Sequence, residues 1–223
     1  MDRYELSVKR FDEFASEYAE RFANIDAYRK HIDQFCARIP GHNPAILELA
    51  CGPANVTSYL KQRFPDSRIV ALDLSPRMIA IARQVVRGVD FRIMDVRKIH
   101  SLELQFDAIM CSFCLPFLSK EDTDKLIIDC AGRLKDKGIL YISTMEGDES
   151  RAGFESTCFS GDAKVYFNYH MQDDLERALT ANGFSVAYAV RQDYDEPDGS
   201  TTVDLILVAE KQTNVIATNA IVP

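Results

Sequence analysis

Four carboxylates in this chain each stand at the end of a short apolar run. They are Glu48, Asp73, Asp95 and Glu146. If these runs are parallel strands of one sheet, their carboxyl ends meet at the edge where such sheets bind ligands. A carboxylate only accepts hydrogen bonds and can take two donors, so it suits a ligand with paired hydroxyl groups. The convergence of these acids, more than any one of them, indicates a binding site.

The first of these acids belongs to a strand, turn and helix. Residues 45–49 predict a buried strand and residues 56–64 a helix, with a break at Gly52. The small residues around the break allow a ligand to approach the backbone, and amides at the helix start can face it. A dinucleotide fingerprint would need a third glycine where Asn55 stands, and asparagine is too large for that place. A strand, turn and helix without a ligand is the other interpretation of this stretch taken alone.

The stretch resembles motif I of the class I methyltransferases that use S-adenosylmethionine (SAM), in which an acid precedes three small residues at alternate positions. Those places are filled here by Glu48, Ala50, Gly52 and Ala54. The resemblance implies that Asp73 binds both ribose hydroxyls of SAM and that Asp95 accepts from the adenine amino group. It implies cofactor contacts for a wider set: Tyr18, Glu48, Ala50, Cys51, Gly52, Asp73, Leu74, Met78, Asp95, Val96 and Cys111.

Aromatic and apolar residues at helical spacing predict an amphipathic helix over residues 9–23 and a second helix over 26–38. The apolar stripe of the first helix is typical of a core-facing surface. The pattern Phe11-Asp12-x-x-Ala15-x-x-Tyr18 also resembles the N-terminal helix that closes over the cofactor in small-molecule methyltransferases. Both interpretations stay open for Tyr18.

Strand-like and helix-like runs alternate five times between residues 45 and 146. This repeat predicts an α/β fold with a doubly wound, Rossmann-like sheet. Two further strands are expected at 184–194 and 202–209, and the second of these is apolar on both faces, which places it inside the sheet. The resemblance implies seven strands, mostly parallel, with an antiparallel terminal strand beside the fifth. A dinucleotide fold would end its sheet with a parallel strand instead.

We expect a single methyltransferase domain over residues 1–223, because no repeat or second domain is visible. Its expected parts are an N-terminal helical cap (1–40), a SAM-binding core (45–146), a substrate-side lid segment (147–170), the last helix with the terminal hairpin (171–210) and a frayed tail (211–223).

The segment 147–170 interrupts the repeat with loop-like stretches and many aromatic residues. A long aromatic connection above strand ends is often a pocket wall, although such aromatics can also pack on their own scaffold. We predict that the acceptor is bound by Phe113, Tyr166, Tyr169 and His170. His170 is the candidate base for a hydroxyl or ammonium acceptor, and a histidine that only borders the last helix is the alternative. No catalytic residue is assigned.

Composition narrows the choice of partners. The net charge is −8, which disfavours nucleic acid and anionic membranes as partners. No apolar run is long enough to span a membrane, and the N-terminus lacks a signal-peptide core. The six cysteines lack the spacing of a zinc site, so we expect no metal, reduced thiols and a cytoplasmic protein.

These features favour an enzyme that transfers a methyl group from SAM to an O, N or C atom of a small molecule, with S-adenosylhomocysteine (SAH) as the product. The alternatives are an NAD-type enzyme on a doubly wound sheet, a non-catalytic SAM-binding module and chemistry like that of polyamine synthases. The sequence does not identify the acceptor or the oligomeric state.

Overall fold

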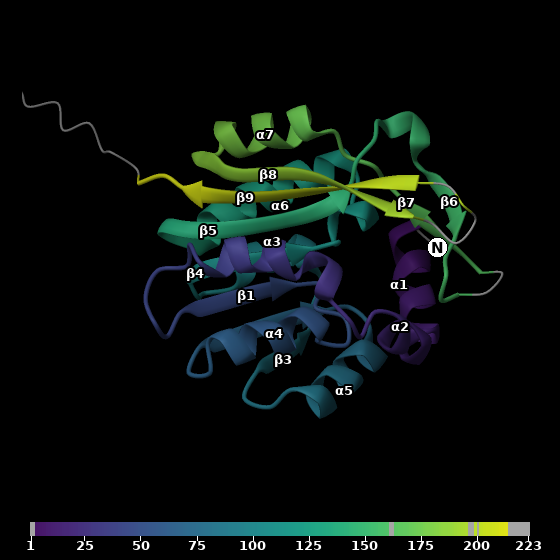
Figure 1. Ribbon diagram of the computed structural model, residues 1–223, viewed down its shortest axis with the longest axis horizontal. Helices are drawn as coiled ribbons and strands as arrows, with labels where there is room; N and C mark the ends of the chain where they lie inside the picture. The colour runs from purple at the N-terminus through teal and green to yellow at the C-terminus, as the bar shows by residue number, and fades with distance from the viewer. Residues whose placement is uncertain (1–2, 161–162, 196–198, 200, 214–223) are drawn as a thin grey trace, which may run out of the picture.

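A seven-stranded sheet runs through the centre of the computed structural model, which describes residues 3–160, 163–195, 199 and 201–213 (Figure 1). The strand order is β3-β2-β1-β4-β5-β9-β8. Neighbours are parallel except at β9, which runs antiparallel to both β5 and β8. The strands are β1 (Ala45–Leu49), β2 (Arg68–Asp73), β3 (Asp90–Ile93), β4 (Phe106–Ser112), β5 (Leu134–Met145), β8 (Phe184–Asp195) and β9 (Thr201–Lys211). The predicted doubly wound, mostly parallel sheet is confirmed.

Helices cover both faces of the sheet, which is why its inner strands are apolar on both sides. One face packs against α3 (Asp26–Cys36), α4 (Asn55–Arg63) and α5 (Pro76–Val85). The other packs against α6 (Lys120–Arg133) and α7 (Gln172–Ala181). The two hydrophobic cores therefore hold the strand ends in fixed positions relative to one another.

Serine caps start two of these helices close to strand ends. Ser75 Oγ accepts a hydrogen bond from the amide of Met78 at 3.0 Å, and Pro76 follows the cap, as predicted. Ser119 Oγ accepts from the amide of Asp122 at 3.1 Å at the start of α6. The α5 cap follows β2 after only one residue, so the chain turns sharply and leaves the end of β2 at the sheet edge.

The bounds predicted for the first N-terminal helix, 9–23, are wrong. Two helices, α1 (Arg3–Glu13) and α2 (Ala15–Arg21), meet at Phe14, whose φ of −107° interrupts the helix. The sequence pattern missed residues 3–8 of α1, where Ser7 interrupts the face formed by Tyr4, Val8 and Phe11. The second predicted helix, 26–38, corresponds to α3.

The segment 147–170 is more ordered than its sequence suggested. It holds a short 3-10 helix, η3 (Glu149–Arg151), and a separate two-stranded sheet formed by β6 (Gly153–Ser156) and β7 (Lys164–Phe167). Four residues are the lower limit for recognising a strand by alternation, and in β7 three apolar or aromatic residues, 165–167, follow one another. The hairpin lies beside α1, so this segment and the N-terminal cap face each other (Figure 1).

The last two strands are arranged as predicted. β9 lies inside the sheet beside β5, and its central residues are buried. β8 is the edge strand and alternates between more and less exposed residues. Most of the predicted frayed tail, 211–223, lies outside the described residues.

Candidate functional site

Left-handed backbone at three alternate residues shapes the turn after β1. The φ angle is 51° at Ala50, 53° at Gly52 and 74° at Ala54. This region costs residues other than glycine about 1–2 kcal/mol, so the two alanines hold strain. A Cβ on Gly52 would lie 3.7 Å from Cε1 of Tyr18, in ordinary contact. Ala50 and Gly52 form part of the wall of a cavity at the carboxyl edge of the sheet.

Asp73, at the end of β2, ties this turn to the next helix. Its Oδ2 accepts from the amide of Gly52 at 2.9 Å, and its Oδ1 accepts from the amide of Ser75 at 2.8 Å. Burial raises the pKa of Asp73, although both amides act in the opposite direction. The carboxylate lines the same cavity and retains lone pairs for further donors.

Glu48 is buried beneath the turn, with only 2% of its surface exposed. Its Oε2 has no hydrogen-bond partner among the described residues, and burial raises the pKa of Glu48 to about 8. A buried acceptor without a donor costs about 1–3 kcal/mol. The turn therefore fits a ligand that brings a positively charged donor, such as an ammonium group.

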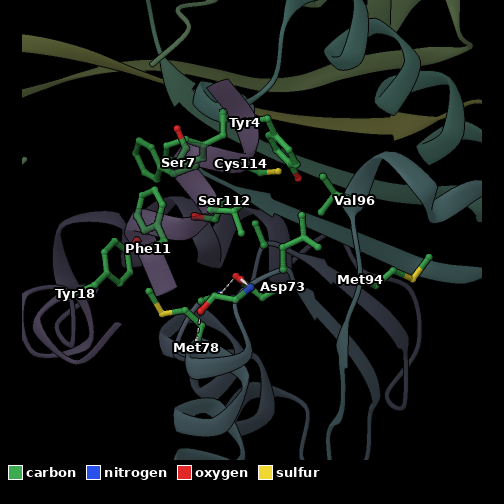
Figure 2. A pocket seen from close by; sticks show the side chains of 17 residues that line it. Tyr4, Ser7, Phe11, Tyr18, Asp73, Met78, Met94, Val96, Ser112 and Cys114 are labelled. Carbon is green, nitrogen blue, oxygen red and sulfur yellow. Dashed lines mark hydrogen bonds between the residues drawn. The ribbon is translucent and has the colours of Figure 1, made fainter. Parts of the chain in front are cut away.

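The N-terminal helices form the roof of the cavity, which encloses about 90 Å³. Tyr4 and Phe11 from α1 and Tyr18 from α2 lie across it from Asp73 (Figure 2). The Phe11 ring centroid lies 5.5 Å from that of Tyr18, and 4.8 and 5.2 Å from the centroids of Phe117 and Phe159 respectively. This aromatic cluster closes the cavity toward the β6–β7 hairpin.

Asp95 lies next to the cavity but does not line it. Arg97 forms a bidentate pair with its carboxylate, with Nη2 2.8 Å from Oδ2. Tyr4 donates its hydroxyl to Oδ1 at 3.3 Å, and the Arg97 guanidinium lies 4.0 Å from the centroid of the Tyr4 ring. Burial raises the pKa of Asp95, but Arg97 outweighs this effect and the pKa is lowered. A ligand amino group would have to share this acid with Tyr4.

The structure brings most of the residues predicted to bind a cofactor to one cavity. Those that line it are Tyr18, Ala50, Gly52, Asp73, Leu74, Met78 and Val96, together with Phe113 from the predicted acceptor set. Glu48, Asp95, Cys51 and Cys111 are not in its wall, and both cysteines are buried in the cores.

The lining residues that the sequence did not place at the site include Tyr4, Ser7 and Val8 of α1. Together with Phe11 they are spaced i, i+3, i+4 and i+7, the spacing of one helical face. This spacing could have revealed the helical face in the sequence, but the polar residue Ser7 interrupts the apolar pattern.

The other predicted acceptor residues lie elsewhere. Tyr169 and His170 line a second cavity of about 310 Å³, which shares no lining residue with the first. Tyr166 lines neither cavity, and its hydroxyl accepts from Nη1 of Arg3 at 2.8 Å. The described residues contain no group of three or more His, Cys, Asp or Glu side chains placed to hold a metal. Among the helices of the described part, none could cross a membrane.

Comparisons with known proteins agree with this geometry. The family model described as "Methyltransferase domain" matches residues 46–138. The demethylmenaquinone methyltransferase of Thermotoga maritima is 24% identical over 209 residues, which cover 82% of this chain and 89% of that protein. The malonyl-[acyl-carrier protein] O-methyltransferase of Bacillus cereus is 33% identical over 144 residues, covering 62% of this chain and 52% of the relative.

Solved structures show the same fold at low sequence identity. Magnesium protoporphyrin IX methyltransferase from Synechocystis, with SAH bound, superposes with a TM-score of 0.71 at 16% identity and covers 95% of this chain and 100% of that one. The DhpI–SAH complex gives a TM-score of 0.68 at 19% identity, covering 94% and 97%. Residues 46–138 thus match a methyltransferase domain, and the chain has the fold of Rossmann-like methyltransferases, in agreement with its resemblance to motif I. It nevertheless spans only about half, or less, of the length of most curated relatives it matches.

Proposed function

We propose that this protein is an enzyme that transfers a methyl group from SAM to a small-molecule acceptor. The observation that carries the proposal is the left-handed turn after β1, which Asp73 ties to α5 at a cavity closed by aromatic residues. Asn55, where a dinucleotide fingerprint needs glycine, and the antiparallel β9 both disfavour an NAD-type enzyme.

The residues at the turn suit the parts of SAM. Asp73 would accept from the ribose hydroxyls, while Leu74, Met78 and Val96 would border the adenine, with Asp95 at its amino group. The amino acid end would lie against Ala50, Cys51, Gly52 and Cys111, and its ammonium would satisfy Oε2 of Glu48 directly or through water. The sulfonium of bound SAM supplies the reactive methyl group. Tyr18 would cover that end, because it packs over Gly52.

The chain's own contribution is to position the reactants and exclude water. The rings of Phe11, Tyr18, Phe117 and Phe159 seal one side of the cavity with apolar surface. Holding the acceptor in line with the methyl group can supply about 7–11 kcal/mol in favourable cases. No protein nucleophile is needed for this reaction.

The cavity is too small for SAM in this conformation. It encloses about 90 Å³, whereas pockets for small ligands are about 300–1,000 Å³. Because α1 forms much of the roof, we infer that the cavity widens by a shift of this helix when the cofactor binds. Two sets of contacts hold this helix: Asp12 accepts from Ser75 Oγ at 2.7 Å and from the amide of Arg77 at 3.0 Å, and Arg3 donates to Tyr166.

The names of relatives support a small acceptor. Trans-aconitate 2-methyltransferase of Escherichia coli, 33% identical over 110 residues, and the demethylmenaquinone enzyme are named for small molecules. Acceptor binding by Phe113, Tyr166, Tyr169 and His170 stays a prediction. Three further expectations also stay predictions: a single domain over 1–223, the absence of nucleic acid partners, and a cytoplasmic location.

A thermal-shift assay with SAM, SAH and NAD tests the cofactor. At 100 times its dissociation constant, a ligand that binds only the folded state adds about 2.7 kcal/mol of stability. We expect SAM and SAH to raise the melting temperature and NAD to leave it unchanged. Stabilisation by NAD with no response to SAM or SAH would refute the proposal. Incubation with methyl-labelled SAM and a panel of small acceptors then tests transfer itself.

A further inference from the structure

Phe113, the first residue after β4, has a strained backbone. Its φ is 50°, in the left-handed region, where a bulky side chain is an outlier that the surrounding structure must enforce. Its amide donates to the carbonyl oxygen of Ser143 on the neighbouring strand β5 at 3.0 Å, and lies 3.1 Å from Oγ of the same serine. These contacts hold the strained residue at the end of β4, where Phe113 lines the first cavity.

Two side chains from distant segments support the ring of Phe113. The ring of Tyr28, near the start of α3, meets it in an edge-to-face contact, with centroids 5.2 Å apart and planes at 75°. The Tyr28 hydroxyl donates to Oδ2 of Asp204 at 2.5 Å. Burial, followed by the charge of Asp204, raises the pKa of Tyr28, so the hydroxyl keeps its proton near pH 7. This charge-assisted hydrogen bond fixes the ring that packs against Phe113.

Asp204 lies in β9, an interior strand of the sheet, and only 3% of its surface is exposed. Burying a carboxylate is costly, and the packing of an interior strand does not require one. The strain at Phe113 and the burial of Asp204 are therefore separate costs to stability. Both are connected to the position of one aromatic ring, which indicates that this position serves the site.

The end of β4 is the part of the cavity wall nearest to the reacting centre of the proposed cofactor. Asp73 after β2 would take the ribose of SAM, and the turn after β1 would take its amino acid end. β4 is the next strand in the sheet, and Leu49 of β1 pairs with Cys111, two residues before Phe113. The sulfonium joins the ribose to the amino acid chain, so its methyl group must point away from both. The end of β4 lies on that remaining side.

We propose that the aromatic ring of Phe113 recognises the positive charge of the sulfonium, and that Tyr28 and Asp204 are positioning residues that hold the ring in place. An aromatic ring attracts a cation within about 6 Å of its centroid, most strongly where water is excluded. SAH lacks the positive charge, so the ring favours binding of SAM over binding of the product. This role of Phe113 rests on the proposed function, because it requires SAM in the first cavity.

Titration calorimetry of the full chain with SAM and with SAH tests this role without an acceptor. The ratio of the two dissociation constants isolates the methyl group and its charge, because the two ligands share all their other parts. Phe113→Leu keeps an apolar side chain and should lower the preference for SAM over SAH by about two- to thirtyfold.

Phe35→Leu is the matched control. Phe35 also packs against a tyrosine ring, that of Tyr141, with centroids 5.9 Å apart, and it lies on α3 as Tyr28 does. Because Phe35 is buried in the core and does not line the cavity, this variant should lower the melting temperature and keep the ratio. An unchanged ratio in Phe113→Leu, or an equal decrease in Phe35→Leu, would overturn the role of the ring.

Variants of Asp204 test the positioning role. Asp204→Ala removes the acceptor of the Tyr28 hydroxyl and should lower the preference for SAM by about two- to fivefold, whereas Asp204→Asn keeps an acceptor oxygen and should preserve it. If Asp204→Ala does not fold, Tyr28→Leu removes the supporting ring and makes the same test. Losses of affinity that are equal for SAM and SAH would overturn the positioning role. A wild-type protein that binds neither ligand would instead refute the proposed function, so the two failures are distinguishable.

Discussion

The two cavities at the carboxyl edge of the sheet are built in different ways. The first is organised by backbone: a left-handed turn, the amides of Gly52 and Ser75, and the acid Asp73 that joins them. The second is organised by side chains, with His170 and four carboxylates drawn from segments far apart in the sequence. The first cavity is therefore determined by the ends of the strands, and the second by the packing of separate segments against one another.

This difference determines what each cavity should tolerate. A site built from backbone and one buried acid should lose its ligand when that acid is removed, and surface charges should matter little. A site built from charged side chains should respond to each charge by a modest amount. The predictions below test the distinction on the first cavity.

Asp73→Ala should have the largest effect. Losing hydrogen bonds to a charged group costs about 1.5–3 kcal/mol each, so SAH binding should weaken by roughly ten- to several-hundred-fold. The unliganded protein should also lose stability, because the amides of Gly52 and Ser75 lose their acceptor. Isothermal titration with SAH and melting curves measure both quantities.

Asp107→Ala is the matched control for this variant. Asp107 accepts from the amide of Ala45 at 2.8 Å, so it ties strand backbone as Asp73 does, but at the opposite end of β1. The control should lose stability and keep its SAH affinity. Equal losses of affinity in both variants would show that Asp73 acts through the fold alone and has no contact with the ligand.

Glu48 should make stability depend on pH. Its folded pKa of about 8 lies above the ordinary value near 4.3, so the folded state binds more protons between these values. The stability contributed by protonated Glu48 should therefore be complete below about pH 4 and be lost as the pH rises through about 8. Because one pKa unit is worth about 1.4 kcal/mol, Glu48→Gln should gain roughly 3–5 kcal/mol at pH 8. Part of the slope should persist, because burial also raises the pKa of Asp73.

Cofactor binding gives a second test of the same acid. If the ammonium of SAH meets Glu48, the carboxyl group ionises on binding and releases a proton at pH 7. The measured heat should then depend on the ionisation enthalpy of the buffer in the wild type and not in Glu48→Gln. Buffer-independent heats in both proteins would place the ammonium elsewhere.

The sequence predicted the first cavity because strand ends are visible in it. Asp73 follows an apolar run, and Ser75-Pro76 is a typical helix start. The sequence alone therefore places Asp73 at the edge of the sheet. The roof was harder to predict, because the contact between Tyr4 and Asp95 joins residues far apart in the chain. The second cavity could not be predicted at all, since Lys120 and His170 converge only once β5, η3 and α7 have packed.

Tyr4→Phe should have a smaller effect on SAH binding. It tests the contribution of α1, which covers the first cavity, separately from that of Asp73 on the opposite side. The variant removes the hydroxyl that shares Asp95 and leaves the ring in place. A neutral hydrogen bond is worth about 0.5–1.5 kcal/mol, so SAH affinity should rise by about two- to tenfold if this contact competes with the ligand. Tyr59→Phe, which loses a bond to Asp33 away from the cavity, is the control. Weaker SAH binding in Tyr4→Phe alone would show that the hydroxyl helps to hold the ligand.

Ala54→Gly should have the smallest effect, and it asks whether the strain in the turn serves the ligand. Ala54 precedes α4 with φ of 74°, a conformation that costs alanine about 1–2 kcal/mol and glycine almost nothing. Glycine loses about 0.5–1 kcal/mol more conformational entropy on folding, so the net gain in stability should be about 0.5 kcal/mol. SAH affinity should stay within twofold, because Ala54 is buried and does not line the cavity. Calorimetric melting and SAH titration of this variant measure both terms. A loss of stability would mean that the packing of the Ala54 methyl group in the core outweighs the backbone strain. A large change in SAH affinity would mean that SAH binding depends on the strained conformation of the turn.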